Sequence, residues 1–128
     1  MAGSIVVAAS DIGGGLTKYS IAWTSDGSGN VNGNTFGIRR GHIQQVKFVP
    51  TNGGAQPTNG YNVTLPDADS VDLLAGKGAG LSNVNASVAV PVVSSLSPMF
   101  CEANTAVALT VAGAGAATNG RVDLIVGP

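Results

Sequence analysis

The sequence contains few side chains that could act together in catalysis. Its one histidine, His42, and its one cysteine, Cys101, are far apart in the chain. Acid–base and nucleophilic catalysis need such groups to converge, usually with a third residue that orients the base. We interpret His42 as a strand residue and Cys101, which follows Met99 and Phe100, as a small buried side chain. The sequence therefore predicts no catalytic residue, and we expect a protein that is not an enzyme.

Asp67, Asp69 and Asp72 form the one acidic cluster of the sequence. Carboxylates two residues apart can bind a hard cation such as Ca²⁺, but an EF-hand loop also needs an oxygen-bearing side chain at the third odd position, where Val71 stands, and a closing acidic residue. Aspartate side chains also accept hydrogen bonds from neighbouring backbone N–H groups in turns. We therefore interpret the cluster as a turn, and we predict no metal ligand.

Basic residues are dispersed, with one adjacent pair at Arg39 and Arg40. Successive strand residues point to opposite faces of a sheet, so one member of the pair can present its guanidinium group to a carboxylate on another chain. We take both as candidate interface residues. Lys77 lies between two glycines, but the earlier glycine and the following hydroxyl residue of a phosphate loop are absent. We therefore predict no nucleotide site and no other cofactor.

The sequence predicts a surface that is poor in charge. Charged residues make up 10% of the 128 residues, against about 25% in ordinary soluble domains. Seven carboxylates and six basic side chains give a formal charge of −1, without the clustered basic residues of nucleic-acid-binding proteins. An uncharged surface favours association with other subunits. We therefore expect protein partners, including other copies of the chain, and no nucleic acid.

The elements that would position these residues are predicted to be β-strands. Short apolar runs rich in Val and Ile are interrupted by Gly, Asn, Asp or Pro about every ten residues, and no window shows the period of an amphipathic helix. Candidate strands fall in residues 5–9, 18–24, 35–39, 42–49, 61–65, 71–74, 84–93, 106–112 and 121–126. About eight short antiparallel strands at this spacing are typical of an all-β, single-domain β-sandwich or jelly-roll-like barrel.

Alternation of apolar and polar residues predicts the core side of each strand. On this basis the inward side chains are Tyr19, Ile21, Trp23, Val46, Phe48, Tyr61, Val63, Leu65, Val107, Leu109, Val111, Val122, Leu124 and Val126. Ile43 is predicted to face the opposite side from Val46. Turn residues between neighbouring strands predict three hairpins. They join residues 18–24 to 35–39, 61–65 to 71–74, and 106–112 to 121–126.

The first residues form an apolar stretch that is expected to meet a partner. We predict that residues 1–10 form an N-terminal strand or arm beside a β-sandwich domain in residues 11–128. If Ile5, Val6 and Val7 lie in an edge strand, its unpaired backbone groups need a neighbouring chain, so the three are candidate interface residues. The stretch lacks the basic flank and the length of a signal peptide or a membrane span. We expect synthesis in the cytoplasm and no membrane partner.

Two segments resemble parts of small virion structural proteins of tailed bacteriophages. They are residues 11–26, DIGGGLTKYSIAWTSD, and residues 61–76, YNVTLPDADSVDLLAG, in which an aspartate-rich turn precedes a V-D-L-L-A-G run. The similarity extends over residues 5–127 and implies a structural role, for which the capsid decoration or cement class fits best. Proteins of that class sit on the outer capsid surface, often as trimers, and clamp neighbouring capsid subunits.

The resemblance implies a definite set of partners for this chain. It would bind the major capsid protein, form a homo-oligomer that we expect to be a homotrimer, and stabilise the capsid of a virion after synthesis in the bacterial host cytoplasm. Two other interpretations remain open. One is a tail, adaptor or fibre-tip component of the same particle, which a low copy number would indicate. The other is a receptor- or carbohydrate-binding β module, although such modules usually stack sugars on exposed aromatic rings, and most aromatic residues here alternate into the predicted core.

Overall fold

The computed structural model describes residues 3–32, 34–38, 41–51, 55–67, 70–90, 92–93, 97–98, 100–101 and 105–127. Every regular element in these residues is a β-strand, and the strands pair antiparallel. The predicted all-β class is therefore confirmed. The same residues contain no helix that is long and apolar enough to cross a membrane.

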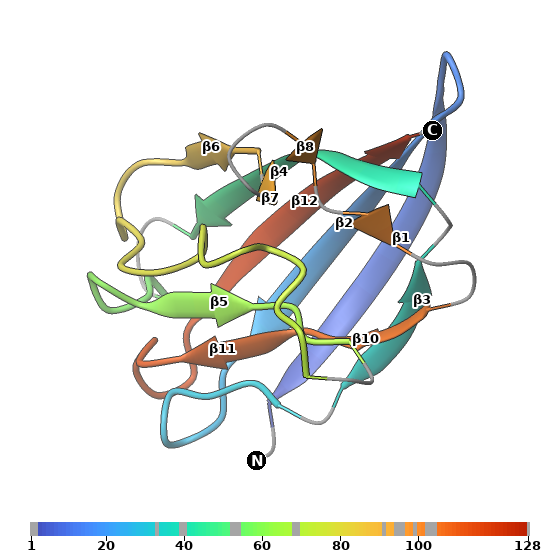
Figure 1. Cartoon of the computed structure of the whole chain (residues 1–128). Coiled ribbons are helices and arrows are strands. Elements are labelled where there is room, and N and C mark those ends of the chain that lie inside the picture. The colour runs from blue at the N-terminus through green and yellow to red at the C-terminus, as the bar shows by residue number, and fades with distance from the viewer. Residues whose placement is uncertain are drawn as a thin grey trace.

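One large sheet forms the frame of the molecule (Figure 1). Its order is β1 (Ser4–Gly13), β2 (Leu16–Thr24), β12 (Asn119–Gly127), β4 (Gly41–Pro50) and β6 (Ser87–Ala89), and β9 (Phe100–Cys101) pairs with the first residues of β4. β1 and β2 form a hairpin that turns at Gly14 and Gly15, where both glycines have a positive φ. The last strand in the sequence, β12, thus lies in the middle of the sheet, between β2 and β4.

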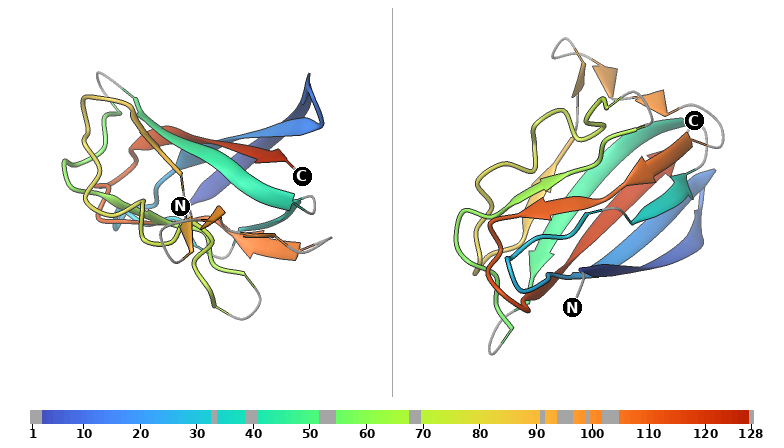
Figure 2. Two further views of the ribbon diagram at one scale, coloured as in Figure 1. Left: turned by 45° about the horizontal axis from the view of Figure 1, so that its top comes forward. Right: turned by 90° about the horizontal axis from the view of Figure 1, so that it is seen from below.

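Short strand pairs lie outside the large sheet (Figures 1 and 2). The pairs are β3 (Thr35–Ile38) with β10 (Thr105–Ala108), β5 (Asn62–Thr64) with β11 (Thr110–Ala112), and β7 (Val92–Val93) with β8 (Ser97–Pro98). The first two pairs form a second layer over one face of the large sheet, which we call the inner face. No strand of the described residues covers the opposite, outer face. The arrangement is sandwich-like.

The core lies between the two layers. Trp23 of the large sheet is buried against Tyr61 of the second layer, with ring centroids 5.6 Å apart and ring planes at 49°. All the side chains that alternation places inward are buried. Removal of this apolar surface from water is the main gain in free energy on folding. The predicted core is therefore confirmed.

Strand β4 departs from simple alternation near its start. Its register with β12 shifts between Ile125 and Val126, so one residue of β4 is extra, which is a β-bulge. The bulge turns Ile43 to the same face as Val46, and Ile43 is fully buried. The prediction that Ile43 faces away from Val46 is wrong, because alternation assumes an uninterrupted ladder.

The predicted hairpins are not those that form. β2 pairs with β1 and β12 rather than with β3, and β12 pairs with β2 and β4 rather than with β11. Two of the three predicted hairpins are therefore wrong. The third is reduced to a single bridge between Pro66 and Asp72, with turns in place of a strand over residues 71–74. The strand predicted over residues 84–93 is likewise divided into β6 and β7.

Buried hydrogen bonds hold the crossing from β11 to β12. The Ser25 hydroxyl donates to the Gly115 carbonyl oxygen at 2.6 Å and accepts the Thr118 N–H at 2.8 Å. The Thr118 hydroxyl donates to the Ala114 carbonyl oxygen at 2.8 Å. Buried polar groups need such partners. These bonds fix a connection that carries the chain from the second layer to the middle of the large sheet, which explains why β11 and β12 do not form a hairpin.

The contact between Trp23 and Gly120 gives a test of this packing. The two residues pair across β2 and β12, and a Cβ at Gly120 would lie 2.7 Å from Cζ2 of the indole. Gly120→Ala should therefore lower the free energy of unfolding by about 1–3 kcal/mol. The loss should shrink in a Trp23→Phe background, because phenylalanine lacks the ring atom that the new methyl group meets. Urea unfolding of the double-mutant cycle measures the coupling, and equal losses in both backgrounds would contradict the packing.

Tyr61 gives the fold a dependence on alkaline pH. Burial raises the pKa of its hydroxyl to about 12, above the unfolded value of about 10. The folded state holds the proton of Tyr61 more tightly than the unfolded state does. The stability that this residue contributes is therefore complete below about pH 10 and is lost as the pH rises from about 10 to about 12. We expect the free energy of unfolding to fall by about 1 kcal/mol at about pH 11, and Tyr61→Phe to remove this loss. Urea unfolding at about pH 8 and about pH 11 compares the two proteins, and a parallel decline in both would assign the loss to other groups.

Candidate docking surfaces

Strand β1 is an open edge of the large sheet (Figure 1). It stands first in the strand order, and among the described residues β2 is the one strand that pairs with it. The edge is long, because the strand has 10 residues. The backbone N–H and C=O groups that point away from β2 belong to no described strand pair. Such an edge is able to accept a strand from another protein.

The three apolar residues that the sequence assigns to an interface lie on different faces of the large sheet. Ile5 and Val7 lie on the inner face, where they are half-buried and pack against the core. Val6 lies on the outer face with 71% of its surface exposed. Val6 is therefore the member of the trio that a partner can cover. The other two candidate interface residues, Arg39 and Arg40, lie outside the described residues.

A charged cluster lies at the centre of the outer face. Asp123 of β12 belongs to this face, yet 5% of its surface is exposed. Its carboxylate accepts the Ser20 hydroxyl at 2.7 Å and the Arg121 Nε–H at 3.1 Å, and the Lys18 Nζ lies 4.0 Å away. Lys47 of β4 lies directly across from Asp123 in the register. The fold thus gathers three cations around one carboxylate.

This cation cluster, defined as Lys18, Lys47 and Arg121 around Asp123, has the opposite sign to the whole chain. Its formal charge is +2, whereas the chain carries −1. The side chains of Lys18 and Arg121 are 41% and 47% exposed, so solvent screens their attraction to Asp123. Alternation in residues 18–24 places Lys18 on the polar face, which is the one signal of this cluster in the sequence. The rest was missed, because it comes from strands far apart in the chain.

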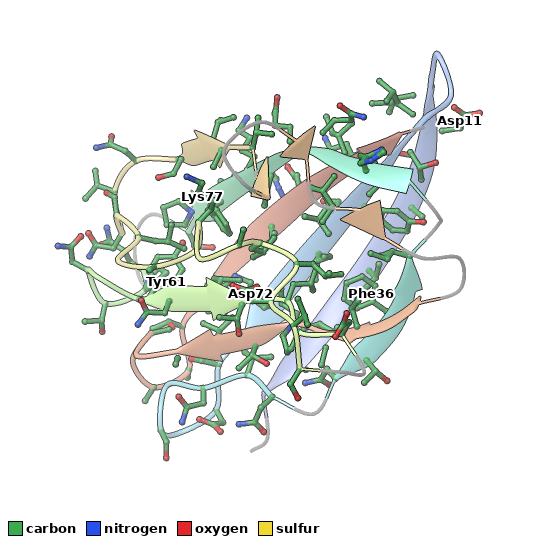
Figure 3. The ribbon with its side chains drawn as sticks, viewed as in Figure 1. Asp11, Phe36, Tyr61, Asp72 and Lys77 are labelled. Atoms are coloured by element: carbon green, nitrogen blue, oxygen red, sulfur yellow. The ribbon has the colours of Figure 1, made fainter. Side chains whose placement is uncertain are left out.

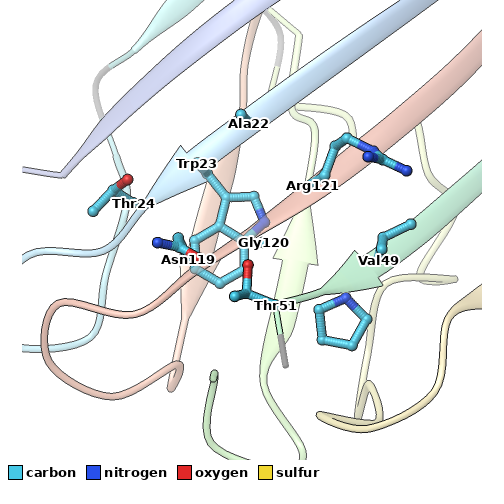
Figure 4. Close-up of a pocket in the computed structure, with 9 residues that line it drawn as sticks. Ala22, Trp23, Thr24, Val49, Thr51, Asn119, Gly120 and Arg121 are labelled. Atoms are coloured by element: carbon cyan, nitrogen blue, oxygen red, sulfur yellow. The ribbon is translucent and has the colours of Figure 1, made fainter. Parts of the chain in front are cut away.

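A shallow depression of about 330 Å³ lies beside the cation cluster (Figure 4). Its lining comes from three neighbouring strands and consists of Ala22, Trp23, Thr24, Val49, Pro50, Thr51, Asn119, Gly120 and Arg121. Each strand contributes three consecutive residues, and the middle ones, Trp23, Pro50 and Gly120, are buried. The side chains around the depression are therefore those of their outward-facing neighbours. Four of them, Thr24, Thr51, Asn119 and Arg121, can donate hydrogen bonds. The described lining contains no carboxylate.

The aspartates of the predicted acidic turn act on the backbone, in the part that the structure describes. The Asp72 carboxylate accepts three backbone N–H groups at 2.9, 3.0 and 3.1 Å, and the Asp67 carboxylate accepts the Val71 N–H at 3.0 Å. Figure 3 shows Asp72 beside β5 in the second layer. Asp69 lies outside the described residues. The turn interpretation is confirmed for Asp67 and Asp72, and no three His, Cys, Asp or Glu side chains of the described residues gather as a metal site requires.

The strands that carry His42 and Cys101 are neighbours. Cys101 pairs with Gly41, and Phe100 pairs with His42, between β9 and β4. The fold therefore brings onto adjacent strands two residues that spacing in the sequence keeps apart. His42 is half-buried, and the side chain of Cys101 is outside the described ones. That the chain is not an enzyme stays a prediction.

Comparison of the chain with protein-family models, with curated proteins and with solved structures gives no match. The resemblance to virion proteins therefore stays a prediction that rests on two sequence segments. What the chain does has to be inferred from the open edge of β1, the cation cluster and the depression beside it.

Asp123 is the residue on which the cation cluster depends. Asp123→Asn keeps the shape of the side chain and an acceptor for Ser20, but removes the charge that faces Lys18 and Arg121. Because both cations are partly solvated, we expect the free energy of unfolding to fall by about 1–2 kcal/mol, less than for a fully buried ion pair. The loss should shrink in high salt, where the pairs of the unchanged protein are screened.

Urea unfolding at low and high salt measures this effect. Asp11→Asn is the matched control, because Asp11 is exposed and accepts one local hydrogen bond, from the Gly13 N–H. An Asp123→Asn protein as stable as the control at both salt concentrations would show that the cluster contributes nothing to folding.

Proposed function

We propose that this chain is a structural subunit of a larger protein assembly, not an enzyme, and that it attaches through the open edge of β1. The specific role that we propose is a capsid decoration protein of a tailed phage. In that role a homotrimer of the chain binds the major capsid protein on the outer surface of the virion and stabilises the shell. The unprotected edge of β1 is the observation that carries the attachment. The sequence resemblance supports the phage role and the trimer.

Most of the β1 edge lacks the features that keep an open edge from binding. Soluble proteins protect such edges with Lys, Pro, bulges or very short strands. β1 has 10 residues, contains neither Lys nor Pro, and pairs regularly with β2 from Ser4 to Asp11, with a register shift at its hairpin end between Asp11 and Gly13. Its one charge, Asp11, lies near the tip of the hairpin (Figure 3). An edge of this kind is suited to strand addition, in which a partner supplies the missing backbone hydrogen bonds.

The described aromatic side chains argue against the alternative of a carbohydrate-binding module. Tyr19, Trp23, Phe48 and Tyr61 are buried in the core. Phe36 is half-buried and packs against the same core. Sugar platforms need exposed aromatic rings. A tail or adaptor role differs from the capsid role in copy number, which quantitative mass spectrometry of a purified particle measures.

Val6 provides the direct test of the edge. Val6→Lys places a charge on the exposed face of β1, as natural edge strands do to prevent association. Val84→Lys is the matched control, because Val84 is 58% exposed but lies in a loop. We expect Val6→Lys to weaken binding to capsid shells assembled without this protein by at least about tenfold, which corresponds to about 1.4 kcal/mol. The control should bind as the unchanged protein does.

Sedimentation of mixtures of shells and protein gives the bound fractions, and circular dichroism confirms that both variants fold. Equal binding by the two variants would remove the β1 edge from the mechanism. Absence of binding by the unchanged protein, with no gain in the heat resistance of the shells, would contradict the capsid role.

A further inference from the structure

The outer face of the large sheet carries a positive charge that folding alone does not require. Three of the six basic residues of the chain gather there around one carboxylate. A single cation would neutralise Asp123. The two further positive charges therefore stay on a surface that no described strand covers.

Arg121 is held in an orientation that leaves most of its guanidinium group available. Its Nε–H donates to Asp123 at 3.1 Å, which orients the group. Its two terminal nitrogens make no hydrogen bond with any other described residue, and 47% of the side chain is exposed. A guanidinium fork that is oriented in this way can bind a carboxylate through two parallel hydrogen bonds.

Lys47 adds a second cation that is not committed to the fold. It lies across from Asp123 in the register, but its side chain makes no ion pair or hydrogen bond within the described residues. Lys18, on the far side of Asp123, is 41% exposed. The three cations lie on neighbouring strands, so they can contact one partner segment together.

The depression beside Arg121 extends this positive surface. Its rim offers the hydroxyl groups of Thr24 and Thr51 and the amide of Asn119, and no carboxylate opposes an incoming acidic group in the described lining. Ala22 and Val49 flank Arg121 in the register, and their short side chains do not cover its guanidinium group. A carboxylate can therefore approach Arg121 from the solvent.

We propose that the outer face of the large sheet is a docking surface for an acidic segment of a partner protein, with Arg121, Lys47 and Lys18 as the residues that bind its carboxylates. The inference rests on the proposed function as an assembly subunit, and it assigns the chemistry of the partner. Charge complementarity carries it, since a +2 cluster on a chain of charge −1 favours an acidic partner. Nucleic acid fits less well, because exposed Val6 and Val88 lie on the same face in place of further basic residues.

The test is a titration of the full-length, isotope-labelled chain with N-acetyl-hexaglutamate amide, followed by NMR. We expect saturable shifts confined to β2, β12 and β4 around residues 22, 47 and 121, and a loss of binding in high salt. Lys47→Gln should weaken binding at least about fivefold, without unfolding, because the Lys47 side chain has no hydrogen-bond or ion-pair partner among the described residues. Arg121→Gln should weaken it as much or more.

Lys77→Gln is the matched control, because Lys77 is an exposed lysine in the segment between β5 and β6 (Figure 3), so this substitution should leave binding unchanged. Equal weakening by the control, or shifts on another surface, would overturn the inference. Tighter binding of a short DNA duplex would assign the face to nucleic acid and would overturn it too. Concentration-dependent shifts of the same residues without peptide would show that a second copy occupies the face, which is equally contrary to it.

The two proposals can fail separately. If the peptide does not bind while the unchanged chain still sediments with shells, the acidic docking surface is wrong and the assembly role stands. If the peptide binds this face while shells bind nothing, the capsid role is wrong and the acidic partner has to be sought elsewhere.

Discussion

The pairing of β12 on both of its sides is the constraint on which the rest of the structure depends. β12 joins β2 and β4 over almost its whole length and is the central strand of the large sheet. Because successive residues alternate, this one strand sends Val122 and Leu124 into the core and presents Arg121 and Asp123 on the outer face. A shift of one residue would exchange the two sets. Burial of the core therefore also fixes the position of the cation cluster.

The sequence predicts the local features of this fold better than the long-range ones. Alternation is a property of single strands, so the inward side chains of β2, β11 and β12 follow from it. Strand neighbours depend on contacts across the whole chain, and the closing hairpin is wrong because the Ser25–Thr118 bonds belong to a crossing between layers. The bulge near Ile43 cannot be predicted from the sequence for the same reason, since it is defined by the register of β4 with β12. From the sequence the edge position of β1 is only a hypothesis, because its apolar residues do not show which strands pair, and the cation cluster needs three strands that only the fold unites.

The open edge of β1 and the cation cluster are parts of one continuous surface. Val6, Ala22, Arg121 and Val49 lie in one register row across β1, β2, β12 and β4. Neighbouring strands are about 4.8 Å apart, so Arg121 lies about 10 Å from β1. A strand added at β1 would extend this row beyond Val6. The segment that bonds to the edge and the segment that meets the cations can therefore belong to the same partner.

Charged contacts on the outer face can define the register of an added strand, which backbone hydrogen bonds alone leave weakly defined. A strand that slides by two residues along an edge recovers the same alternation and the same backbone bonds, so its register is weakly defined. Ser4, Val6, Ala8 and Ser10 on the outer face of β1 are small and offer little to distinguish one register from the next. A carboxylate that meets Arg121 in one register lies about 7 Å away after such a slide. Because electrostatic complementarity contributes more to specificity than to affinity, a few charges held at fixed places are enough to select the register, while backbone bonds and apolar contacts supply the affinity. The few charges of this chain can select the register of a bound strand only where they lie at fixed positions near the edge, and the outer face of β12 is such a position.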